Sequence, residues 1–275
     1  LQHSKVFQTK IYRAVSQILL QKHSYRELER FMISIYRKFN KARWFDKNNH
    51  DTKLQMLTFL VNSLSRNGKT AKSLECAEEL GRELEAYNRL HYKKYVFYLY
   101  NARVINYSES APQKALTALK ELEEAIKGNA DAYYQMFIHL NRGILYFKTG
   151  KFSDAIRSFV KYYTNDYYKS ADNLFKLRVS VAEMMMHIES KDQPTTKIRL
   201  EQIQKQFKNE LLQPDAISEK ELLGWMKTLL KNNLKYQDNV VQKELALLIK
   251  SKILRKTEDS QLLNYSAWLQ SKTRA

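Results

Sequence analysis

The side chains that most often perform catalysis are scattered along this sequence. The chain has no G-x-S-x-G nucleophile turn, no phosphate-binding P-loop and no dinucleotide-binding glycine pattern. Its histidines form no i, i+4 pair and have no carboxylate-rich neighbourhood with metal-ligand spacing. They are His3, His23, His50, His91, His139 and His187. We therefore expect a protein that is not an enzyme and that holds neither a metal ion nor a cofactor.

The single cysteine, Cys76, is surrounded by acidic residues. Glu75, Glu78 and Glu79 are its near neighbours in the segment LECAEEL. Negative charges raise the pKa of a thiol, which is the wrong direction for a nucleophile. We expect Cys76 to be a small buried residue. One cysteine cannot form an internal disulfide, which fits a reducing compartment, and the expected location is the cytoplasm.

One stretch mixes aromatic and basic side chains in a pattern suited to binding. Its aromatic residues are Tyr92, Tyr95, Phe97, Tyr98, Tyr100 and Tyr107, and Lys93, Lys94 and Arg103 lie among them. Such mixtures bind single-stranded nucleic acid by stacking and phosphate contact, or grip a peptide. The alternative is packing between helices. Because these aromatics do not share one helical face, some must belong to the core.

The charge of the chain is high and uneven. The formal net charge is +18. Residues 75–86 hold five glutamates against Arg82, whereas residues 1–50 hold 11 basic side chains against three acidic ones. The 11 are Lys5, Lys10, Arg13, Lys22, Arg26, Arg30, Arg37, Lys38, Lys41, Arg43 and Lys47. A basic N-terminal region of this kind can bind nucleic acid.

Two other interpretations of the charge stay open. Lysines outnumber arginines 32 to 15, which fits the codon usage of AT-rich genomes without any selection for binding. Segregated charges of both signs would also allow copies of the chain to associate with one another.

Composition and periodicity indicate which elements position these residues. The chain has 6 glycines and 3 prolines, where average usage gives about 19 and 14, and apolar residues recur at helical spacing. The sequence therefore predicts an all-α fold of long helices with short connections. We expect helices near 4–22, 25–43, 51–67, 70–87, 90–107, 111–127, 131–148, 152–165, 168–189, 194–211, 217–233, 237–254 and 260–271.

The expected helix ends follow from local signals. Ser24 with Glu27, and Ser218 with Glu221, fit capping boxes. Gly68, Gly128 and Gly150 each follow an apolar-periodic run and predict C-caps. No apolar run approaches the roughly 18 residues of a membrane span, so no membrane contact is expected. The chain begins at Leu1 without a methionine, as a fragment or a processed product would.

Residues 139–163, HLNRGILYFKTGKFSDAIRSFVKYY, carry small and aromatic residues at a characteristic spacing. Gly143 and Ala155 allow two helices to cross closely, Tyr146 and Phe159 fill the space beside the crossing, and Gly150 makes the turn. This segment resembles the tetratricopeptide repeat (TPR). It departs from that pattern at four positions, His139, Arg142, Tyr162 and Tyr167.

Fainter echoes of the same unit occur earlier in the chain. Ser73 lies five residues after Gly68, as Ala155 does after Gly150, and Ala115 occupies an equivalent place. These small residues are 42 and 40 residues apart, longer than the roughly 34 of a standard TPR and nearer to the roughly 40–47 of other helical repeats.

The resemblance implies a right-handed superhelical α-solenoid of antiparallel hairpins. We expect one such domain over residues 1–275. Its best TPR-like units cover 51–165, and residues 168–275 form helical hairpins without a clear motif.

The resemblance also implies a ligand groove along the first helix of each hairpin. In the best unit it points to Phe137, Leu140, Ile144, Phe147 and Lys148, although the four apolar residues could equally form the hairpin core. In the unit aligned on Gly68 it points to Gln55, Thr58, Asn62 and Arg66. Asn62 matches an asparagine that some TPR domains use to hold a peptide carboxylate, but Thr58 replaces the lysine of that clamp.

Two functions are therefore expected of this sequence. The first is a non-enzymatic scaffold that holds a peptide or protein segment in the groove. The alternative is a helical-repeat protein that binds nucleic acid through its basic N-terminal region.

Overall fold

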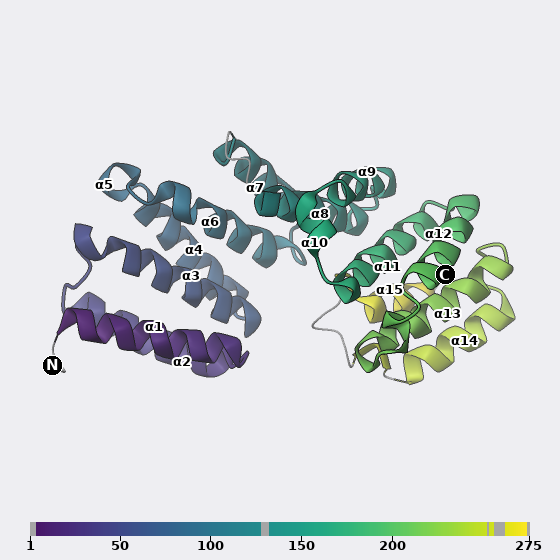
Figure 1. Cartoon of the computed structure of the whole chain (residues 1–275), viewed down its shortest axis with the longest axis horizontal. Coiled ribbons are helices and arrows are strands. Elements are labelled where there is room, and N and C mark those ends of the chain that lie inside the picture. Colours follow the sequence, from purple (N-terminus) through teal and green to yellow (C-terminus); the bar gives the residue numbers. More distant parts are fainter. Residues whose placement is uncertain (1–3, 128–131, 252, 256–261, 274–275) are drawn as a thin grey trace. The chain divides into compact units, whose positions relative to one another are not determined.

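The chain folds entirely into helices over the residues that the computed structural model describes, which are 4–127, 132–251, 253–255 and 262–273. No β-strand occurs among them. Residue contacts divide the chain into two compact units, unit 1 (Leu1–Ala130) and unit 2 (Asp131–Ala275), which are described separately (Figure 1). The all-α prediction is confirmed.

Unit 1 is built from helices that pack in consecutive pairs. The pairs are α1 with α2, α3 with α4, and α6 with α7, and α3 and α4 both contact α6 (Figure 1). The helices are α1 (Lys5–Gln21), α2 (Tyr25–Lys41), α3 (His50–Arg66), α4 (Thr70–Leu84), α5 (Ala86–Arg89), α6 (Tyr92–Tyr107) and α7 (Pro112–Ala125), with a 3-10 turn η1 (Lys47–Asn49) before α3. Short α5 contains left-handed Tyr87 and Asn88, so it acts as a turn between α4 and α6.

Unit 2 continues with helices of similar length. They are α8 (Ala132–Lys148), α9 (Phe152–Tyr163), α10 (Asp166–Ser170), α11 (Asn173–Glu189), α12 (Gln193–Gln206), α13 (Ile217–Lys231), α14 (Asn239–Lys250) and α15 (Tyr265–Lys272). Three 3-10 turns, η2 (Glu210–Leu212), η3 (Pro214–Ala216) and η4 (Ile253–Arg255), flank α13 and α14. The expected 168–189 helix is divided because Asp172 caps a new helix, accepting a hydrogen bond from the Phe175 amide.

The expected turns and caps are confirmed only in part. Gly68 and Gly150 have φ of +72° and +74°, the left-handed C-cap conformation, while Gly128 lies outside the described residues. Ser24 precedes α2, but its side chain makes no capping hydrogen bond. The capping box at Ser218 is wrong, because α13 already begins at Ile217 and the Ser218 hydroxyl donates instead to the carbonyl of Ile253 (3.1 Å).

Small buried residues mark the second helix of three hairpins. Ser73 in α4, Ala115 in α7 and Ala155 in α9 are each fully buried. In the α8–α9 hairpin, the ring of Phe159 lies directly against Gly143, as the sequence predicted. The repeat-like spacing therefore coincides with fully buried small residues in all three hairpins.

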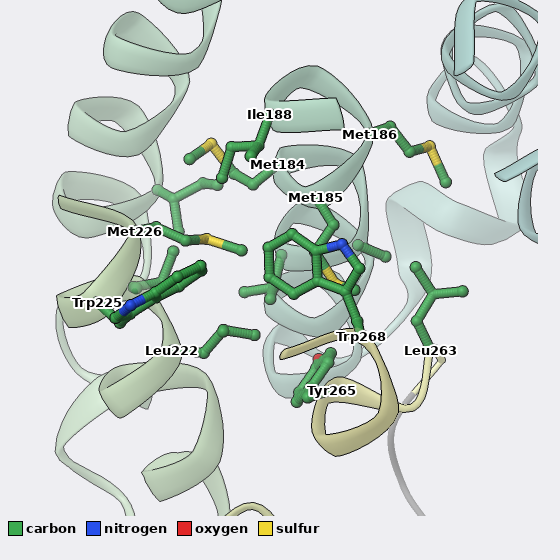
Figure 2. Close-up of a cluster of buried hydrophobic side chains, with 14 of the residues drawn as sticks. Met184, Met185, Met186, Ile188, Leu222, Trp225, Met226, Leu263, Tyr265 and Trp268 are labelled. Atoms are coloured by element: carbon green, nitrogen blue, oxygen red, sulfur yellow. The ribbon is translucent and has the colours of Figure 1, made fainter. Parts of the chain in front are cut away.

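Helix α11 forms the centre of the unit 2 core. Every side chain from Val179 to Ile188 is buried, as expected of a helix that is covered on all sides. Figure 2 shows Met185 of α11 beside Trp268 of α15, whereas Met186 lies on the side of α11 away from Trp225 of α13. The two tryptophan rings meet edge to face with centroids 5.7 Å apart.

One buried carboxylate joins three helices of unit 2. Glu183 of α11 is 6% exposed and accepts hydrogen bonds from the Tyr163 hydroxyl of α9 (2.7 Å) and from Arg199 of α12. The Nε2 atom of His187 lies 3.5 Å from its other oxygen. Burial by itself raises the pKa of Glu183, but these partners lower it below its ordinary value of 4.5.

Substitution of Gly143 tests the close crossing of α8 and α9. A Cβ atom at this position would lie 2.4 Å from two ring carbons of the fully buried Phe159, so we expect Gly143→Ala to lower the free energy of unfolding by about 1–3 kcal/mol. Gly224→Ala is the matched control. No described atom lies within 4 Å of its Cβ position, so alanine should stabilise α13 by about 0.5–1 kcal/mol. Urea denaturation measures the free energy of unfolding of both variants. Equal changes in this free energy for Gly143→Ala and Gly224→Ala would contradict the close crossing of α8 and α9.

Substitution of Glu183 tests the carboxylate network. A carboxyl group whose pKa is lower in the folded state contributes stability that is complete above its unfolded pKa and is lost as the pH falls through its folded pKa. We expect Glu183→Gln to lower the free energy of unfolding by about 3 kcal/mol at pH 7, and the difference from wild type to shrink below pH 4.5. Urea titrations followed by the fluorescence of Trp225 and Trp268 measure this. A difference that stays constant with pH would rule out the ionised network.

Candidate functional site

A groove between α3 and α6 is the candidate binding site of unit 1. It is an open depression of about 250 Å³. Each helix contributes residues three and four positions apart, so the groove follows one face of α3 and one face of α6. Its described lining residues are Thr58, Phe59, Val61, Asn62, Ser65 and Arg66 of α3, and Tyr98, Asn101, Ala102, Ile105 and Asn106 of α6.

The groove combines accessible apolar surface with a small residue between the apolar side chains. Tyr98 and Ile105 are 42% and 45% exposed. Ala102 lies between them in the sequence and is buried. An extended segment could therefore cover Tyr98 and Ile105 while it lies along α6.

Asn106 is held in one orientation by unit 1 itself. Its Nδ2 donates both protons, one to the Ser73 hydroxyl (2.9 Å) and one to the Ala102 carbonyl (2.8 Å). The Ser73 hydroxyl in turn donates to the carbonyl of Val61 (2.9 Å), so it can only accept from Asn106. The amide cannot be flipped without placing an oxygen against the Ala102 carbonyl.

The fixed amide leaves an acceptor with no donor. Asn106 is 5% exposed and lines the groove, yet its Oδ1 has no hydrogen-bond partner among the described residues. The Oδ1 of Asn101, five residues earlier, is also buried without a partner in the described structure. Buried carbonyl oxygens of this kind normally accept hydrogen bonds. Two groove-lining residues of α6 thus each carry a buried acceptor without a donor in the described part of the chain.

The charge of the groove comes from one side chain. Arg66 is the one charged residue among the described lining residues, and its guanidinium lies 5.7 Å from the centre of the Tyr25 ring. Asn62 is exposed one helical turn before it. Together these two residues offer hydrogen-bond donors at the end of the groove where α3 finishes.

The residues predicted for the earlier unit come together only in part. Thr58, Asn62 and Arg66 all line the groove. Gln55 does not, because its Oε1 accepts a hydrogen bond from the Tyr12 hydroxyl of α1 (3.2 Å). The Thr58 hydroxyl donates to the carbonyl of Leu54 within its own helix (3.0 Å), so it offers mainly an oxygen acceptor and a methyl group.

The second predicted set belongs to α8 of unit 2. Leu140 is 9% exposed and forms part of the core. Ile144 and Phe147 are half-buried against that core, and the Phe147 ring lies 5.7 Å from that of Phe152. Phe137 is half-buried and Lys148 is exposed. The alternative that these apolar side chains form hairpin core therefore describes Leu140, Ile144 and Phe147 well.

Half of the groove was missed from the sequence. The residues of α6 that line it lie at positions 98, 101, 102, 105 and 106, a regular helical face. The alignment that pointed to Asn62 started from Gly68 at the α3–α4 turn. The α6–α7 hairpin has no glycine at its turn, so the same alignment could not be applied to α6. Of the aromatics in this stretch, Tyr95 and Phe97 are buried and Tyr98 is the most exposed, which confirms that some of them are core.

The nucleophilic and metal-binding candidates show ordinary environments. In the described part of the chain, no group of three or more His, Cys, Asp or Glu side chains is placed to hold a metal ion. His3 lies outside the described residues. Cys76 is half-buried against the unit 1 core, not fully buried as expected. Burial raises the pKa of its thiol to about 11, and the nearby carboxylates of Glu79 and Glu75 act in the same direction.

Comparison with known proteins leaves the groove as the main guide to function. The chain matches no protein-family model, no curated protein and no solved structure. Over the described residues, no helix combines the length and the apolar character needed to cross a bilayer.

The environment of Cys76 predicts a slow thiol. Two pKa units change the fraction of reactive thiolate roughly hundredfold, so at pH 8 we expect a disulfide reagent to label folded protein roughly a hundred times more slowly than urea-denatured protein. Spectrophotometric thiol titration measures both rates. Equal rates in the two states would show that Cys76 is neither buried nor electrostatically suppressed.

Proposed function

We propose that this chain is a non-enzymatic binding scaffold that holds a peptide or protein segment in the groove between α3 and α6. The observation that carries the proposal is the pair of buried amide oxygens on α6. Asn101 and Asn106 both line the groove, and the Oδ1 atom of each is buried without a hydrogen-bond partner among the described residues. The N–H groups of a peptide main chain are suitable donors for them.

The remaining lining residues complement other parts of such a ligand. Asn62 and Arg66 can donate hydrogen bonds to peptide carbonyl groups or to a carboxylate. Tyr98 and Ile105 supply exposed apolar area that a ligand side chain can cover. Hydrogen bonds from the asparagine side chains to the peptide main chain would contribute affinity for any sequence. Contact of Tyr98 with an apolar ligand side chain would add affinity and select among sequences.

The composition of the groove supports binding rather than catalysis. Its described lining residues include no histidine, cysteine, lysine or carboxylate. Proton transfer at neutral pH is usually carried out by these groups, and an arginine side chain stays protonated. A catalytic site in this chain would therefore need acid–base groups that lie outside the groove.

The finer architecture is part of the same proposal. We propose a TPR-like helical repeat in which α3 and α6 are first helices of successive units. The fully buried Ser73, Ala115 and Ala155 at nearly regular spacing support it, as does the Gly143–Phe159 contact. A cytoplasmic location remains part of the proposal and is supported by the single cysteine.

Peptide selection followed by groove substitutions tests the function. A random peptide library is selected on the immobilised chain, and the strongest binder is measured by fluorescence anisotropy. Tyr98→Ala should weaken it about tenfold or more, because aromatic anchors dominate such interfaces. The double variant Asn62→Ala with Asn101→Ala should weaken it roughly 3–30-fold through two lost hydrogen bonds.

Matched substitutions outside the groove serve as controls. Tyr167 of unit 2 is 49% exposed and Asn40 of α2 is exposed, so Tyr167→Ala and Asn40→Ala should leave the affinity unchanged. The proposal fails if no peptide is selected, or if the control variants weaken binding as much as the groove variants do.

A further inference from the structure

Four basic side chains form one continuous row on the outer face of α2. Arg26, Arg30, Arg37 and Lys41 are all exposed and are four, seven and four residues apart. At 100° per residue this spacing keeps them within an arc of about 60°, and the row is about 22 Å long. We call these four residues the α2 row.

The α2 row is held on a rigid helix. The opposite face of α2 carries Leu28, Met32, Tyr36 and Phe39, all of them buried in the unit 1 core. The row therefore presents its charges in a fixed line on the surface of unit 1, where α2 lies beside α1 (Figure 1). The described groove residues come from α3 and α6, so the row is a separate surface.

The α2 row is not neutralised by the rest of the described structure. Arg30 lies 3.4 Å from Glu27, but both side chains are more than half exposed, and such surface pairs are weak. Arg26, Arg37 and Lys41 have no ion pair among the described residues. Glu29, the other acidic residue of α2, is buried and pairs with Lys69 (2.6 Å).

The acidic segment 75–86 cannot serve as the partner of this row, because most of its carboxylates already have partners within unit 1. Only Glu75 lacks one among the described residues. The other pairs are Glu78 with Arg103, Glu79 with the Tyr36 hydroxyl, Glu83 with Lys53 and Glu85 with Arg89. Most carboxylates of the acidic segment therefore have a partner within unit 1, whereas Arg26, Arg37 and Lys41 of the α2 row have no ion pair among the described residues.

The residue types in the α2 row argue against a compositional origin. Lysines outnumber arginines 32 to 15 in the whole chain, yet three of the four residues in the row are arginine. Codon bias toward lysine does not produce this choice. Arginine is the residue that binds phosphate through two parallel hydrogen bonds.

We propose that the α2 row binds the phosphate backbone of double-stranded DNA without reading its sequence. A duplex carries one charge for about every 1.7 Å of its length when both strands are counted, so a segment as long as the row holds about 13 phosphates and offers one to each of its four side chains. The major groove of B-form DNA is wide enough for a helix surface, whereas that of A-form RNA is too narrow.

Other polyanions fit the row less well. Proteins that bind single strands provide aromatic stacking platforms, and the aromatic side chains of α2 are buried or half-buried. Helices that bind membranes insert their apolar face, but the apolar face of α2 is enclosed in the core. The exposed apolar residues of the N-terminal hairpin, such as Phe7 and Ile11, lie on α1 instead.

Salt-dependent DNA binding tests the proposal directly. Anisotropy of a labelled short DNA duplex is measured with the full chain between 50 and 200 mM salt. Four phosphate contacts give a slope of about −3.6 in log affinity against log salt, which is a loss of roughly a hundredfold over this range. The variant with Arg26, Arg30, Arg37 and Lys41 all changed to Gln should lose binding at 50 mM salt, with its circular dichroism and its groove peptide affinity unchanged.

A charge-matched variant separates a specific row from diffuse charge. Lys205, Lys208, Lys220 and Lys243 of unit 2 are exposed, and changing all four to Gln removes the same charge while DNA binding should persist. The proposal is overturned if this control loses binding equally, or if no duplex binds at 50 mM salt. It is also overturned if single strands, duplex RNA or anionic phospholipid vesicles bind more tightly than duplex DNA.

Discussion

The hydroxyl of Ser73 is the contact on which the candidate groove depends. It is fully buried at the point where α4 crosses α3, donates to the Val61 carbonyl of α3 and accepts from the Asn106 amide of α6. One small polar side chain therefore fixes the spacing of α3 and α4, and the rotation of α6 against both. Alanine at this position would allow the same approach but would remove one of the two hydrogen bonds that orient the Asn106 amide.

Neighbouring helices of unit 1 are joined by polar contacts as well as by apolar ones. Asp51 of α3 accepts a hydrogen bond from the Tyr95 hydroxyl of α6 and pairs with Lys94 (2.5 Å). Glu78 of α4 binds Arg103 of α6, which also reaches Glu121 of α7 (3.6 Å). Each of these pairs uses a carboxylate, and the chain has 29 acidic residues against 47 basic ones. Because acidic side chains are fewer than basic ones, many lysines and arginines have no carboxylate to pair with. Some of these basic side chains lie on the surface of α2, a helix that packs mainly through apolar side chains.

The helices of the two units pack in different ways. Unit 2 encloses α11 on all sides with methionine, leucine and tryptophan, and its buried carboxylates include Glu183, whose partners come from α9, α11 and α12. An enclosed charge that has several partners fixes the register of the helices around it. Unit 1 leaves the α3–α6 face open, with exposed Tyr98 and Ile105. A binding role suits the unit whose helices keep accessible apolar and amide groups.

The sequence by itself determined the helices, most of their ends and the close crossings. Gly68, Gly150 and Gly143 with Phe159 could be placed because helical periodicity and turn geometry act between residues a few positions apart. The TPR resemblance, aligned on Gly68, pointed to Thr58, Asn62 and Arg66, which line the groove, and to Gln55, which does not. Only the tertiary structure decided which groups meet across hairpins. Asn106 reaches Ser73 over 33 residues, and Tyr36 reaches Glu79 over 43. Such pairs depend on how each helix is rotated about its own axis when it packs. The spacing of residues along the chain does not encode this rotation, and without a glycine at the turn between two helices the repeat register cannot be extended from one to the next. For the same reason the sequence could not show that most carboxylates of residues 75–86 find partners within unit 1, whereas Arg26, Arg37 and Lys41 of α2 have no ion pair among the described residues.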